Sequence, residues 1–82
     1  MDLQITHSLV LAAIFELLQA DRAVTRPRLS ALTGLSPERL LRALAELEVN
    51  GWVDREELRL TLPGLAVAVA VQGRATARRM AA

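Results

Sequence analysis

The sequence predicts a mainly α-helical fold with one small β-hairpin, and three observations support this prediction. First, two apolar-periodic segments flank a Thr-Gly-Leu-Ser turn at residues 33–36. Second, Leu40, Leu44 and Leu47 recur at the i, i+4, i+7 spacing of an amphipathic helix. Third, two strand-like runs joined by a charged tip follow within residues 52–62. A helix-turn-helix followed by a hairpin is a winged helix-turn-helix.

The first helix is expected over residues 3–20, and it is apolar on more than one side. One stripe at helical spacing consists of Val10, Ile14, Leu17 and Leu18. Leu11 and Phe15 lie on a different side, so the apolar face exceeds the ~100° that a surface helix needs. Two explanations stay open: the helix is buried by its own domain, or it offers Leu11 and Phe15 to a second copy. We favour the second, because so short a chain has little material to cover both sides.

A short strand and a second helix are expected next. Residues 23–25, Ala-Val-Thr, form the strand candidate. The second helix is expected to begin at about Arg26, with Pro27 in its first turn, and to continue to about residue 33. Its inner face would carry Leu29 and Leu32.

The turn and the third helix have clear boundary signals. Gly34 stands where the second helix must stop, because glycine adopts the left-handed conformation without a Cβ clash. Ser36 can cap the third helix, and Pro37 at its first position loses no helical hydrogen bond. Asn50-Gly51 ends that helix. The helix-turn-helix is therefore expected to cover residues 27–50.

The wing is expected at residues 52–62. Residues 52–54 would form its first strand, residues 55–57 its charged tip and residues 58–62 the returning strand. In that returning strand the three leucines, the last of them Leu62, would share one face.

A fourth helix is expected at about residues 63–79, with a strand over residues 65–71 as an open alternative. The alternating Leu-Ala-Val-Ala-Val-Ala-Val pattern has the period of a strand, whereas its alanines favour a helix. Such a helix would suit packing against the first helix of a second copy, through Val67 and Val71.

Composition excludes several classes of protein. The 82 residues make one small domain, residues 1–82, and the absence of cysteine excludes disulfides and thiolate metal sites. The single histidine, His7, cannot form a metal site alone and is expected at the surface. No nucleophile–base pair or phosphate-binding glycine loop is present, so we expect neither an enzyme nor a cofactor. Without a signal peptide or membrane span, a cytoplasmic protein is expected.

Four motifs carry a resemblance to known families: Leu-Ser-Ala-Leu-Thr-Gly-Leu-Ser at 29–36, the leucines of the third helix, Asn-Gly-Trp-Val at 50–53 and Leu-Thr-Leu at 60–62. Over residues 9–68 the chain resembles bacterial transcriptional regulators of the MarR, ArsR and IclR type. The resemblance implies a third helix in the DNA major groove, a wing on the flanking backbone or minor groove, and a homodimer made by the terminal helices. Residues 35–44 are also similar to the dimerisation domain of small-molecule O-methyltransferases, which implies no DNA binding.

Candidate DNA-binding residues lie on the second and third helices. Arg39 and Arg42 stand one turn apart on the expected outer face of the third helix, where arginine can bond two guanine acceptors. Residues 22–42 hold five arginines and one acid, a local surplus of +4 that the whole-chain net charge of +1 hides. The expected phosphate contacts come from Arg26, Arg28, Ser30 and Ser36, and weaker wing contacts come from Arg55 and Arg59.

Three features oppose this interpretation: an apolar Leu41 on the same face, two acids, Glu38 and Glu46, and an acidic wing. In the alternative, Arg39 and Arg42 only pair with those two acids on a solvated face. We therefore favour a homodimeric, sequence-specific regulator of transcription that binds double-stranded DNA, with a regulatory protein as a further partner. A protein-interaction or dimerisation module is the alternative. The expected dimer interface is Leu11, Phe15, Val67 and Val71.

Overall fold

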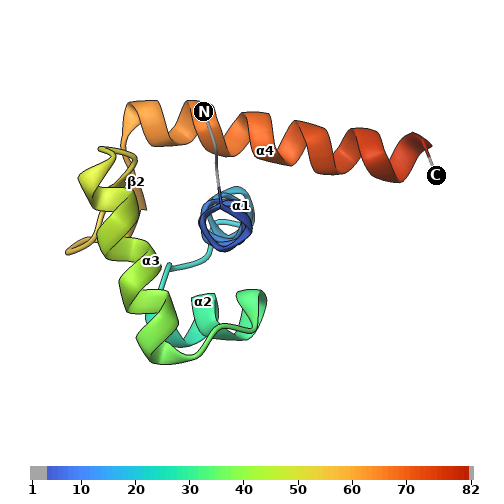
Figure 1. Cartoon of the computed structure of the whole chain (residues 1–82). Helices are drawn as coiled ribbons and strands as arrows, with labels where there is room; N and C mark the ends of the chain where they lie inside the picture. Colours follow the sequence, from blue (N-terminus) through green and yellow to red (C-terminus); the bar gives the residue numbers. More distant parts are fainter. Residues whose placement is uncertain (1–3, 82) are drawn as a thin grey trace.

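A computed structural model describes the backbone of residues 4–81 and the side chains of residues 4–73. Within these residues the elements are α1 (Ile5–Gln19), α2 (Arg26–Thr33), α3 (Pro37–Val49), β1 (Val53–Asp54), β2 (Arg59–Leu60) and α4 (Leu62–Ala81). Figure 1 views α1 almost along its axis, with α4 lying across it on one side and α2 and α3 on the other. The predicted fold class, mainly α with a small hairpin, is confirmed.

The apolar core is organised around α1. Its residues Val10, Leu11, Ile14 and Leu17 are buried against leucines of α2 and α3 and against Ala68 of α4. Leu11 is 0% exposed and so has no surface left for a second copy. Of the two explanations for the broad apolar face of α1, burial within its own domain is therefore the correct one for Leu11. Leu18, expected in the inner stripe, is instead exposed at the end of α1.

The turn between α2 and α3 forms as its sequence predicts. Gly34 has a φ of +75° and donates its backbone N–H to the Ser30 carbonyl at 2.8 Å. The Ser36 hydroxyl accepts the Arg39 backbone N–H at 3.3 Å, and Pro37 is the first residue of α3. The helix-turn-helix boundaries follow from these two caps.

The inner face of α2 is narrower than predicted. Leu29 is fully buried, but Leu32 is 48% exposed. Three residues turn a helix by roughly 300°, so Leu32 lies about 60° from Leu29 around the axis. In a helix of only eight residues, the contact with α1 and α3 covers Leu29 alone.

The strand expected at residues 23–25 is absent from the described structure. The sheet pairs β1 with β2 only, through Val53 opposite Leu60 and Asp54 opposite Arg59. The Ala23 carbonyl accepts the Arg28 guanidinium at 2.8 Å, so a side chain provides the bond that a neighbouring strand would have made.

The wing is shorter than predicted, because its returning strand covers residues 59–60 rather than 58–62. Leu58 has a φ of +53°, which lies outside the β region and leaves this residue in the turn. The Asp54 carboxylate accepts the backbone N–H groups of Glu56 and Glu57 at 3.1 and 3.3 Å, and so holds the tip. Leu62 is exposed and begins α4.

Thr61 joins the wing to α4. Its hydroxyl donates to the Gly51 carbonyl at 2.6 Å and accepts the Gly64 backbone N–H at 3.0 Å, while its own N–H donates to the Trp52 carbonyl at 3.1 Å. This threonine therefore caps the first turn of α4. Residues 65–71 are helical, so the helix was the correct alternative.

We predict that Gly64→Ala destabilises the domain by about 3 kcal/mol, at the upper end of the usual range for overpacking. A Cβ at Gly64 would overlap the backbone carbonyl of Trp52, which cannot move without disturbing the wing. Thermal or urea unfolding followed by circular dichroism measures the change. Gly73→Ala is the matched control, because a Cβ there meets nothing within 4 Å. It should stabilise the same helix by about 0.5–1 kcal/mol; equal effects would contradict the close approach at Gly64.

Candidate nucleic-acid interface

The outer face of α3 carries the candidate base-reading residues. Leu40, Ala43, Leu44 and Leu47 are buried and hold the helix against the core. Arg39 and Arg42 are exposed on the opposite side, in the first two turns. The capping hydrogen bond from the Arg39 N–H to Ser36 fixes the start of this helix and thus the position of both side chains.

The two arginines of α3 are not paired with the acids of the same helix. Within the described residues, salt bridges join Arg55 to Glu48 and Arg59 to Glu57, and Nε2 of His7 lies 3.5 Å from Glu46, a contact that is ionic only if the histidine is protonated. The pairing of Arg39 and Arg42 with Glu38 and Glu46, expected if the face were only a solvated surface, does not occur among them. Both guanidinium groups therefore keep their donors available for a ligand.

A polar hollow of about 170 Å³ lies between the first turn of α1 and the outer face of α3. Its lining residues are Gln4, Thr6, Arg39, Arg42, Ala43 and Glu46. α1 begins here with neither a side-chain cap nor an acid in its first turn. The positive end of the α1 dipole and two guanidinium groups thus meet in one place, opposed by a single carboxylate.

His7 is buried, contrary to the prediction of a surface residue. It is 7% exposed, and its Nε2 atom lies 3.5 Å from Oε1 of Glu46 without a hydrogen-bond partner. The physical reason is its position: His7 precedes Val10, Leu11 and Ile14 by three, four and seven residues and so lies on the buried side of α1. The helical spacing was the signal that would have placed this residue in the core.

The first turn of α2 presents two more exposed arginines, Arg26 and Arg28. Thr25 caps this helix through the Arg28 backbone N–H, at 3.3 Å. The guanidinium of Arg28 also holds the preceding loop, so this residue is fixed at both its backbone and its side chain. Ser30 is half-buried, whereas Ser36 is exposed and keeps its hydroxyl proton for a further acceptor.

The wing arginines are already compensated by acids. Arg55 contacts Glu48 both through its side chain, at 3.6 Å, and through its backbone N–H, at 3.0 Å. Arg59 pairs with Glu57 at 3.1 Å. These paired charges should attract phosphate less than the unpaired arginines of α3, and a weaker wing contact stays a prediction.

The fold and the exposed α3 define a winged helix domain. Comparison with known families matches residues 4–57 to the DprA winged helix domain, more than half of the chain, and the chain belongs to that family. This match supports the winged helix fold, while the resemblance to MarR, ArsR and IclR regulators and to the O-methyltransferase domain stays a prediction. No curated protein and no solved structure matches the chain. None of the helices in the described region combines the length and apolarity needed to cross a membrane.

We predict that Ser36→Ala destabilises the domain by about 1 kcal/mol, because the first turn of α3 loses its cap. The cap is the hydrogen bond from Arg39. Chemical unfolding measures the loss, and Ser30→Ala serves as the control, since the Ser30 hydroxyl makes no hydrogen bond within the described part of the chain. The control should stay within about 0.5 kcal/mol of wild type. A Ser36→Ala protein as stable as wild type would rule out the cap as a determinant of α3.

Proposed function

We propose that this domain, residues 1–82, binds double-stranded DNA with α3 in the major groove. The observation that carries the proposal is the pair Arg39 and Arg42, exposed and without an acid partner among the described residues, in the N-terminal half of a firmly held helix. The major groove admits an α-helix, and helix-turn-helix proteins use the N-terminal residues of that helix for base contacts. Membership of a winged helix family supports the same reading.

The proposed contacts divide by chemistry. Arg39 and Arg42 read guanine edges, because each can donate two parallel hydrogen bonds to one base. Phosphate contacts from α2 and from the turn fix the register of α3 on the duplex. Those contacts come from Arg26, Arg28, Ser30 and Ser36, with weaker additions from Arg55 and Arg59 in the wing.

We further propose that the domain regulates transcription and binds as a homodimer to a DNA site with two-fold symmetry. Self-association would use the outer surfaces of α1 and α4, at the half-buried Phe15, Val67 and Val71. Two copies joined there would present two α3 helices, and dimeric helix-turn-helix proteins bind half-sites one helical turn apart.

We predict that the double change Arg39→Ala, Arg42→Ala weakens binding to a specific duplex at least about thirtyfold, because two bidentate contacts are lost at about 1 kcal/mol or more each. Fluorescence anisotropy measures the affinity. The probes are the DNA upstream of the protein's own gene and a scrambled duplex, each at two salt concentrations. Preference for the first duplex, with affinity falling as salt rises, is the expected wild-type behaviour.

The matched control for this variant is Arg55→Ala, Arg59→Ala, which removes the same charge from the acid-paired wing. It should weaken binding only a few-fold and equally on both duplexes. Equal losses in the two double variants would show that net charge, not base readout by α3, controls binding. Unchanged affinity in the α3 variant would refute the site assignment.

We predict that the wild-type protein is a dimer and that Val71→Glu makes it a monomer, because an unpaired carboxylate is costly to bury in an interface. Sedimentation equilibrium measures the mass. Val71 is half-buried yet stands outside the group of residues packed on the core, so the fold should tolerate the change. Val49→Glu, at an exposed position in α3, is the control and should leave the dimer intact. A dimer that persists in Val71→Glu would place the interface elsewhere.

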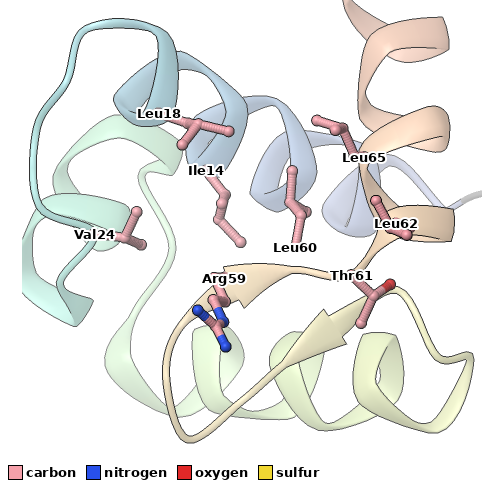
Figure 2. A pocket seen from close by; sticks show the side chains of 8 residues that line it. All are labelled: Ile14, Leu18, Val24, Arg59, Leu60, Thr61, Leu62 and Leu65. Carbon is pink, nitrogen blue, oxygen red and sulfur yellow. The ribbon is translucent and has the colours of Figure 1, made fainter.

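A second candidate function, docking of another protein, is favoured by one specific feature. An open hollow of about 240 Å³ lies between the end of α1, β2 and the start of α4. Figure 2 shows Leu60 pointing from β2 toward Ile14 and Leu65, with Leu18 and Val24 at the edge, while Arg59 and Thr61 point to the other side. Absent or equal binding to both duplexes would favour this function over DNA recognition.

A further inference from the structure

The contact between His7 and Glu46 joins the buried side of α1 to the DNA-facing side of α3. The imidazole is almost fully buried, and its Nε2 atom has no hydrogen-bond partner. Glu46 Oε1 is 3.5 Å away, and the Glu46 carboxylate is about half-exposed in the hollow that Arg39 and Arg42 also line. One carboxylate therefore touches both the histidine and the proposed site.

Histidine is the side-chain type whose charge ordinarily changes between pH 5 and 8, and the chain holds a single histidine and no cysteine. Among the described residues, Glu46 is the one acid with a carboxylate oxygen within 4.0 Å of an imidazole nitrogen of His7. The side chains of α4 that the structure describes, residues 62–73, include no charged group. The other charged residues on the elements packed against α1 are Arg26 and Arg28 of α2, Glu38, Arg39, Arg42 and Glu48 of α3, and Arg59 of β2.

We propose that proton uptake by His7 strengthens DNA binding by α3, an inference that rests on the proposed function. With His7 neutral, Glu46 presents an uncompensated negative charge beside Arg39 and Arg42, and this charge repels phosphate. A protonated His7 forms an ion pair with Glu46 and cancels that charge without occupying either arginine. DNA binding therefore tightens as the pH falls and weakens as the pH rises.

The test measures duplex affinity by fluorescence anisotropy at about pH 5.5 and about pH 8.0, on either side of the range in which histidine titrates. Wild type should bind about three- to fivefold more tightly at the lower pH, the size of one partly exposed charge interaction. Calorimetry in two buffers of different ionisation heat should show net proton uptake on binding. Glu46→Gln should bind more tightly than wild type at the higher pH and lose most of the pH dependence.

Two further variants separate the outcomes. Glu38→Gln removes the other carboxylate of this α3 face, and Glu38 has no contact with the histidine. This variant should bind DNA more tightly than wild type at both pH values and keep the wild-type ratio of the affinity at the lower pH to the affinity at the higher pH. His7→Phe should abolish the pH dependence of the affinity. If this change in the core disturbs folding, Glu46→Gln still tests the inference, because Glu46 is partly exposed. A wild-type ratio retained in Glu46→Gln, or a wild-type protein without pH dependence, would overturn the inference alone. Absence of duplex binding at both pH values would overturn the proposed function.

Discussion

The domain depends on the burial of α1 from both sides. Leu11 and Ile14 have almost no exposed surface, because α2 and α3 cover one side of the helix and α4 covers the other. Each such side chain contributes about 1.5–3 kcal/mol relative to its exposed state. An 82-residue chain has little core to spare, so a helix that is apolar on more than one side is best used at its centre. α2, α3, α4 and β2 all pack against this helix, and β1 is held by α3 and β2.

The hydrogen bonds of Thr61 allow α3 and α4 to cover α1 from opposite sides. Its hydroxyl and backbone N–H bind the end of α3, the start of β1 and the first turn of α4 together. Gly64 then lets α4 approach the Trp52 carbonyl more closely than any side chain would permit. Because α3 and α4 are fixed to each other here, α1 is enclosed between them and α3 is left with one free face. That free face is the proposed interface.

Local rules predicted much of the fold from the sequence, and tertiary contacts explain the rest. Gly34, Ser36 and Pro37 fixed the helix-turn-helix, because caps and left-handed turns depend on residues a few positions apart. The strand expected at residues 23–25 failed because a strand needs a partner, which no local pattern can guarantee. The arginines of α3 were identified on its exposed face, but their lack of acid partners was visible only in the structure. The prediction of a surface His7 is wrong because helical position, three residues before the buried Val10, outweighs the polarity of the side chain.

The charges of the proposed interface point to recognition by a few directed contacts. On the outer face of α3, Arg39 and Arg42 are matched in number by Glu38 and Glu46, and the third acid of this helix, Glu48, pairs with Arg55 of the wing. The positive surplus therefore comes from Arg26 and Arg28 of α2. Weak overall attraction gives weak non-specific binding, since that term grows with the number of phosphates neutralised. In the proposed interface, discrimination between DNA sequences would then rest on the geometry of two guanidinium groups rather than on net charge. On a face whose charges nearly cancel, neutralising one carboxylate changes the net charge by a whole unit. The contact between Glu46 and His7 can therefore alter the charge that the proposed interface presents to DNA.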